Sequence, residues 1–188
     1  MKKGSFSGRR NELEEKFFTQ RDEELLRALR EKAASQERKR ALAEASGIED
    51  EDLLDQLDRL EVCGETLAAL SLVPLVAVAW ADGKIDAEER RAVLAAAEQR
   101  GIERDQAGYQ LLDRWLGKKP NARLLEVWRG YVAALVPSLS DTAREALKKD
   151  LLGRARAVAE AAGGLLGFGN KISASEQAVL DDLQKAFG

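Results

Sequence analysis

The chain has 188 residues, of which 45% are hydrophobic and 34% charged, so it is long and apolar enough for one ordinary domain with an appendage. It contains no histidine and one cysteine, Cys63, which excludes imidazole catalysis, an internal disulfide and a zinc site built from thiolates or imidazoles. The 30 basic and 33 acidic residues give a net charge of −3, so we expect no nucleic-acid partner.

The first predicted element is a long helical arm over residues 11–46. This stretch has no Gly or Pro, and Gly47 supplies a C-terminal stop. Apolar residues recur along it at spacings that fit one thin helical stripe, which comprises Leu13, Phe17, Leu25, Leu29, Ala33, Leu42 and Ala45. A helix with so thin a stripe is not stable alone, so we expect it to dock on its own domain, on a protein partner or on a second copy. The residues predicted to make this contact are Phe17, Phe18, Leu25 and Leu29.

All later segments are also predicted to be helical, because none alternates like a strand. We expect helices over residues 50–60, 65–81, 87–100, 105–116, 121–136 and 140–162, and a last helix that begins at Ser173. A glycine-rich connector over residues 163–170 should join the last two. The three tryptophans lie among apolar helical residues, which favours core positions. The sequence therefore predicts an all-α bundle of about seven or eight helices after the arm.

Residues 66–81 form the longest uncharged stretch, with 16 residues. A membrane span needs about 20 apolar residues, and Pro74 interrupts this segment, so we expect a buried core helix that is broken or kinked near the proline. No apolar segment follows the basic residues at the N-terminus, as a secretory signal would require. We expect no membrane insertion and a cytoplasmic location.

A short repeat links two parts of the chain at a constant offset of 87 positions. Lys84-Ile85-Asp86-Ala87-Glu88-Glu89 aligns with Lys171-Ile172-Ser173-Ala174-Ser175-Glu176, with identical residues at four of six positions. Each copy contains a capping box, in which the first side chain accepts from a helix amide and the glutamate reaches back to the N-cap amide. Each copy is therefore predicted to start a helix, and the isoleucine before it to be a buried anchor.

The first copy also has the spacing of the latter part of an EF-hand loop. Asp82, Asp86 and Glu89 would supply carboxylates to a divalent cation, calcium being the first candidate, while Gly83 allows the sharp bend. The earlier ligand positions fall on Val78 and Trp80, which carry no side-chain oxygen. Two alternatives stay open: a capped turn without a metal, or a weak divalent-cation site. No cofactor is required by either.

The segment from Leu70 to Glu89, an apolar helix followed by an Asp-Gly-Lys-Ile turn and an acid-led helix, resembles the TerB-like family. That family includes tellurite-resistance proteins and the N-terminal domain of a DnaJ-type co-chaperone. The resemblance covers about residues 64–188 and implies an all-α bundle with two similar halves, each with an acidic turn. It also implies that Asp82, Asp86 and Glu89 are cation ligands. In the second half only Glu176 remains as an acid.

The resemblance divides the chain into an arm with a short acidic helix, residues 1–63, and a TerB-like domain, residues 64–188. It implies a bacterial, stress-associated interaction or regulatory module with a protein partner, rather than an enzyme. The alternative is a divalent-cation sensor that works through the turn from Asp82 to Glu89. Tellurite chemistry would call for thiols or a redox cofactor, and one cysteine supplies neither. The arm bears a faint similarity to a bacterial ATP-synthase inhibitor, over Glu14–Phe18 and Asp22–Leu25.

Overall fold

In the computed structural model, the described backbone comprises residues 5–162 and 172–187, and the described side chains are those of residues 23–161 and 172–187. These residues form nine α-helices and one short 3-10 helix, with no β-strand among them, which confirms the all-α prediction. The elements are α1 Ser5–Ser46, α2 Glu51–Arg59, α3 Leu67–Leu70, α4 Val73–Ala79, α5 Ala87–Gln99, α6 Ala107–Gly117, α7 Arg123–Leu135, η1 Val136–Ser138, α8 Asp141–Ala162 and α9 Ala174–Lys185. The predicted glycine-rich connector falls on residues 163–170, outside the described part of the chain.

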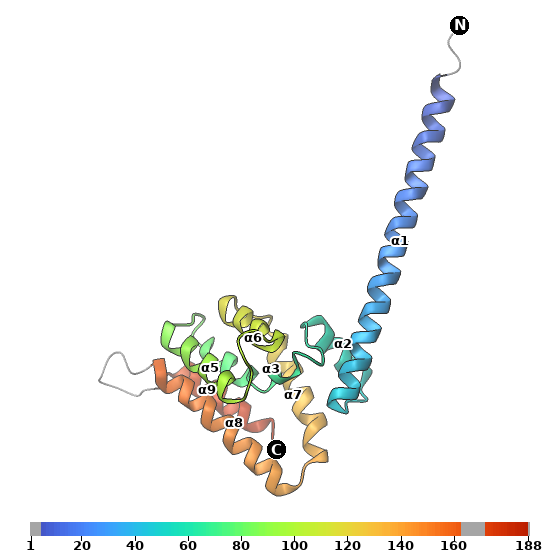
Figure 1. Cartoon of the computed structure of the whole chain (residues 1–188). Helices are drawn as coiled ribbons and strands as arrows, with labels where there is room; N and C mark the ends of the chain where they lie inside the picture. Colours follow the sequence, from blue (N-terminus) through green and yellow to red (C-terminus); the bar gives the residue numbers. More distant parts are fainter. Residues whose placement is uncertain (1–4, 163–171, 188) are drawn as a thin grey trace.

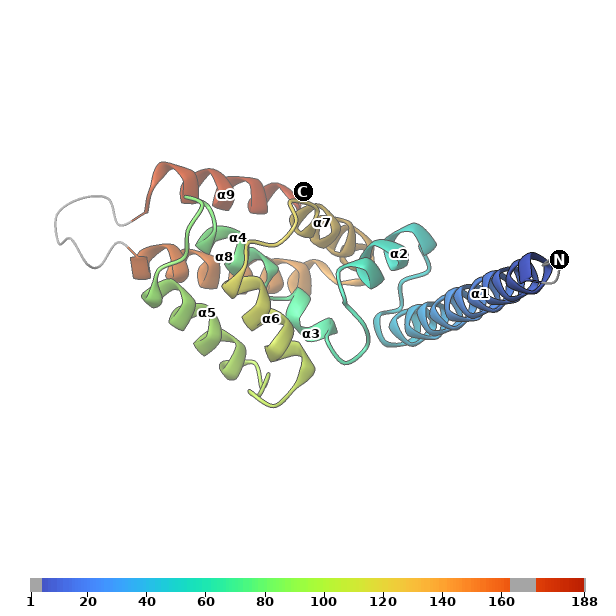
Figure 2. The ribbon, with the colours of Figure 1, turned by 90° about the horizontal axis from the view of Figure 1, so that it is seen from above.

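Helix α4 is the centre of the bundle. It packs against α5, α7, α8 and α9, and Figure 2 shows it among these helices. Val76, Val78 and Ala79 are completely inaccessible to solvent. A helix that is apolar on all sides is stable only in such a buried position, as predicted for this uncharged stretch. No helix in the described ranges is long and apolar enough to cross a membrane.

The predicted helix over residues 65–81 is broken into two. Helix α3 ends at Leu70, and α4 begins at Val73 with Pro74 in its first turn. Proline lacks an amide hydrogen, and the first turn of a helix is where that hydrogen has no intrahelical acceptor. The break therefore lies just before Pro74, which starts the second helix instead of kinking a single one.

The hydrophobic core is one continuous cluster from the end of α1 to the C-terminus. It includes Leu42 of α1, Leu57 of α2 and Phe187, whose ring meets the buried Trp128 edge-on at a centroid distance of 6.2 Å. Helix α2 bridges α1 and α7. Residues on both sides of Cys63 thus share a core, and the proposed boundary between residues 63 and 64 stays a prediction.

Helix α1 extends away from the bundle along most of its length (Figure 1). It begins at Ser5 rather than at the expected residue 11, and it ends where Gly47 adopts a φ of +71°, a conformation that glycine reaches without strain. Only the C-terminal part of α1 packs on the domain, where Leu42 is fully buried. At 1.5 Å per residue, the whole helix is about 63 Å long.

Candidate functional site

The turn between α4 and α5 contains the three carboxylates predicted to bind a cation. Gly83 has a φ of +93°, so this sharp bend favours glycine. The amide of Lys84 donates a hydrogen bond of 3.1 Å to Asp82 Oδ1 across the bend. Ile85 is half-buried and packs against the core, as expected for an anchor. The turn is therefore held without any ion.

Asp86 and Glu89 form the predicted capping box at the start of α5. Asp86 Oδ1 accepts hydrogen bonds of 2.8 Å from the amides of Glu88 and Glu89. The Glu89 carboxylate in turn accepts from the Asp86 amide at 2.8 Å. Both acids thus satisfy backbone donors at the helix N-terminus, where negative charge is also stabilised by the helix dipole.

The second copy of the repeat forms the same capping box at the start of α9. Ser173 Oγ accepts from the Glu176 amide at 3.2 Å, and the Glu176 carboxylate accepts from the Ser173 amide at 2.6 Å. Ile172 packs against the core as Ile85 does. The predicted capping boxes are therefore confirmed in both copies, while the two isoleucines, predicted to be buried, pack against the core but are only half-buried.

Glu89 is a buried carboxylate in an unfavourable environment. Glu89 is only 6% exposed, and this burial is the main reason that its pKa rises to about 7. The hydrogen bond from the Asp86 amide acts in the opposite direction, but the negative charges of Asp86, Glu176 and Asp82 raise the pKa further. The influence of Glu176 indicates that the two capping boxes lie near each other. Glu89 therefore titrates near neutral pH.

The predicted cation ligands differ in burial. Asp82 and Asp86 are exposed, whereas Glu89 is buried, and each already accepts at least one backbone hydrogen bond. Within the described ranges, no group of three or more acidic or cysteine side chains is placed to hold a metal ion. A calcium site in this turn stays a prediction, and its ligands would have to give up or share the hydrogen bonds described above.

The projecting part of α1 exposes three leucines. Leu25, Leu26 and Leu29 are 58%, 52% and 54% exposed, and every residue from 23 to 34 is exposed. Of the four predicted contact residues of the arm, Leu25 and Leu29 thus lie in solvent. Phe17 and Phe18 belong to α1, but their side chains lie outside those described. Leu25, Leu26 and Leu29 therefore do not pack on the domain of their own chain.

Polar contacts with α2 anchor the base of α1. Arg38 donates to both carboxylate oxygens of Asp58, at 2.7 and 3.1 Å, and Ser35 Oγ donates to the same carboxylate at 2.7 Å. Partial burial raises the pKa of Asp58, but the hydrogen bonds from Arg38 and Ser35 outweigh it and bring the pKa below its usual value. Lys39 pairs with Asp55 one turn away. These contacts fix the direction in which α1 leaves the domain.

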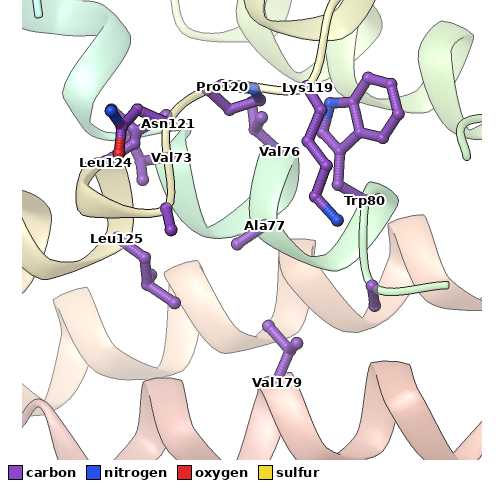
Figure 3. Close-up of a pocket in the computed structure, with 12 residues that line it drawn as sticks. Val73, Val76, Ala77, Trp80, Lys119, Pro120, Asn121, Leu124, Leu125 and Val179 are labelled. Atoms are coloured by element: carbon purple, nitrogen blue, oxygen red, sulfur yellow. The ribbon is translucent and has the colours of Figure 1, made fainter. Parts of the chain in front are cut away.

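A hollow of about 270 Å³ lies between α4, the connection from α6 to α7, α7 and α9 (Figure 3). Most of its twelve lining residues are apolar, and Lys119 is the one ionisable side chain among them. Trp80 lines the hollow while its indole Nε1 donates to the Trp115 carbonyl at 2.8 Å. Such a lining suits an apolar group and provides no acid–base pair for catalysis.

Comparisons of the chain with protein families, with curated proteins and with solved structures give no match. The TerB-like relationship therefore stays a prediction carried by residues 70–89. Sequence reasoning missed the hollow, because its lining comes from three separate segments with no common motif. It also missed that Glu89 and Glu176 are buried, because the capping-box spacing predicts their hydrogen bonds and not their burial.

Proposed function

We propose that this chain is a non-enzymatic protein-interaction module in which the helical bundle holds α1 in place and α1 binds a protein. The observation that carries this proposal is the exposure of Leu25, Leu26 and Leu29 on a helix that stands clear of its own domain. Large apolar side chains grouped on a projecting element are typical of a binding surface. They match the helix-in-groove and helix-to-helix modes of recognition.

Helix geometry places the three leucines on one face. With 3.6 residues per turn, residues three or four apart are neighbours, so Leu29 lies beside both Leu25 and Leu26. Arg27 falls on the opposite side of the helix. The apolar face is therefore narrow and flanked by charge, which suits a partner helix or groove of matching width.

The anchoring contacts at the base of α1 support the same proposal. A binding helix on a loose tether would lose orientational freedom when it binds, and this loss costs affinity. Arg38, Lys39 and Leu42 hold the base of α1 on α2 instead, so the leucine face leaves the domain in a defined direction. The bundle then serves as a scaffold for the arm.

The proposed cellular role rests on the sequence alone. The resemblance of residues 70–89 to the TerB-like family supports a stress-associated, regulatory role. A cytoplasmic location and a catalytically inactive domain are predictions of the same kind. The apolar lining of the hollow beside Trp80 and Lys119, without an acid–base pair, agrees with a binding role.

Affinity capture from native extract tests the proposal. The bait is the full chain, and the test variant combines Leu25→Gln, Leu26→Gln and Leu29→Gln, which keeps helix-forming residues and removes the apolar face. Arg27→Gln on the opposite side is the matched control. Proteins retained by the natural chain and by the control, and lost with the triple variant, are the expected result. The same retained set for all three baits would overturn the proposal.

A further inference from the structure

The arm carries two consecutive blocks of opposite charge, and the exposed leucines lie at the start of the second block. Residues 11–24 contain 2 basic and 6 acidic residues, a balance of −4. Residues 25–40 contain 6 basic and 2 acidic residues, a balance of +4. Both blocks belong to the single helix α1. The charge pattern of one arm is therefore complementary to that of a second arm that lies beside it in the opposite direction.

We infer that the partner of α1 is a second copy of this chain, with the two arms paired antiparallel across the leucine face. The inference rests on the proposed function and names its partner. Antiparallel pairing places each acidic block against the basic block of the other copy. Parallel pairing would instead set acid against acid and base against base, which is unfavourable. A twofold antiparallel contact is also the simplest closed assembly.

The leucines fix the register of this pairing. If residue 27 lies at the centre of the overlap, Leu25 of one copy lies beside Leu29 of the second copy, and the reverse contact follows by symmetry. Arg27 itself is on the side of the helix away from the contact, so the two central arginines do not meet. The acidic residues up to Glu24 then face the basic residues from Arg30 onward. The overlap from residue 11 to residue 43 is about 50 Å long.

A hollow at the base of α1 lies on the same side of the helix as the exposed leucines. The spacing of Leu25, Leu29, Gln36 and Ala43 keeps these residues on one side of the helix. Gln36 and Ala43 line a hollow of about 420 Å³ together with Lys39, Arg40, Ile48, Glu49, Glu51 and Leu54. The leucine face thus leads into a cavity with apolar and charged walls.

The proposed register brings residues 11–18 of the second copy alongside residues 36–43. That segment contains three acidic residues and three large apolar ones, Leu13, Phe17 and Phe18. The hollow offers the apolar side chains of Ile48 and Leu54, while its two basic and two acidic residues balance in charge. The contact expected at this end of each arm is therefore apolar, and the two bundles lie at opposite ends of the assembly.

Sedimentation equilibrium of the full chain tests the pairing. We expect a monomer–dimer equilibrium that weakens as sodium chloride rises, because exposed ion pairs are screened by salt. Leu25→Gln with Leu29→Gln should raise the dissociation constant at least about tenfold, whereas Arg27→Gln should leave it within a factor of about two. A single monomeric species at all concentrations would overturn the inference.

Disulfide trapping tests the orientation. In a chain with Cys63→Ser, one preparation carries Leu25→Cys and another carries Leu29→Cys. Antiparallel pairing predicts that oxidation of the mixture joins position 25 to position 29, while each preparation alone yields little crosslinked dimer, because the two Cα atoms must lie within about 7 Å. Crosslinking of each preparation alone, with none specific to the mixture, would overturn the antiparallel arrangement.

The two proposals fail in different ways. A monomeric chain whose leucine variant loses a different protein from extract would refute self-pairing and keep the binding role of α1. A monomeric chain whose leucine variant loses nothing would refute both.

Discussion

Glu89 and Glu176 occupy the same place in two turns that lie 87 positions apart. Each is only 6% exposed, and each carboxylate accepts a hydrogen bond from the N-cap amide of its own helix, at 2.8 and 2.6 Å. The charge of Glu176 contributes to the raised pKa of Glu89. Two capping boxes thus bring two buried acids near each other at one place in the bundle.

The first prediction concerns the dependence of stability on pH. The pKa of Glu89 is about 7 in the folded chain and 4.5 when the residue is exposed. The folded state therefore binds the Glu89 proton more tightly, and this contribution is complete below pH 4.5 and is lost as pH rises through 7. Chemical denaturation should show the free energy of unfolding falling by about 2 kcal/mol between pH 5 and pH 8.

Glu89→Gln is the matched variant, because glutamine is accepted at this position of a capping box and carries no charge. The variant should lose most of that slope and be more stable than the natural chain at pH 8. The chain has no histidine, so few other side chains titrate in this range. Equal slopes for the two proteins would show that Glu89 is not the titrating group.

The second prediction concerns the N-cap of α9. Ser173→Ala removes the acceptor for the Glu176 amide and should lower the free energy of unfolding by about 0.5–2 kcal/mol while the fold is kept. Ser173→Asp restores an acceptor and should recover most of the loss. Thermal denaturation followed by circular dichroism measures both variants. An alanine variant as stable as the natural chain would show that the cap contributes nothing.

The third prediction concerns the anchor of the arm. Asp58→Ala leaves Arg38 and Ser35 without their shared acceptor and should cost about 1.5–3 kcal/mol, the range for hydrogen bonds to charged groups. Since pairing keeps the pKa of Asp58 low, the same stabilisation should disappear in the natural chain as pH falls below about 4. Amide hydrogen exchange over residues 35–46 should become faster in the variant.

Asp55→Ala is the control for this anchor, because the Asp55 side chain is more exposed than that of Asp58, 44% against 14%, and its ion pair should contribute less than about 1 kcal/mol. If the two variants exchange at the same rate as the natural chain, Leu42 and its apolar neighbours alone would hold the arm.

The fourth prediction concerns calcium. With three carboxylates that already accept backbone hydrogen bonds, the turn should bind calcium no more tightly than about 10⁻⁴–10⁻³ M. Isothermal titration of the full chain measures this affinity, with Asp82→Asn as the variant and Asp105→Asn as a control away from the turn. Micromolar binding that disappears only in Asp82→Asn would favour the cation sensor over the capped turn.

The helices and the two capping boxes could be predicted because their signals are local. Apolar spacing, glycines and the pair of Asp86 with Glu89 act within a few residues of the chain. The depth of Glu89 could not be predicted, because it depends on how α5 packs against α4, α6 and α8. The hollow beside Trp80 and Lys119 likewise depends on three segments that meet only in the fold.

For the arm, too, the sequence predicts the local structure but not the packing. Its helical state was predicted from periodicity, and the leucine stripe was expected to dock. That Leu25 and Leu29 remain exposed depends on the angle at which α1 leaves α2, which Asp58 and Arg38 help to set. A stripe in the sequence indicates a contact surface but not the molecule that covers it.

Photo-crosslinking from position 26 tests the central claim, that α1 is a binding surface, most directly. A benzophenone amino acid replaces Leu26 in the full chain, and the control places it at Lys149, an exposed residue of α8. Irradiation in native extract should give discrete covalent adducts, with a second copy or with another protein, from position 26 and not from position 149. An absence of adducts specific to position 26 would contradict the claim.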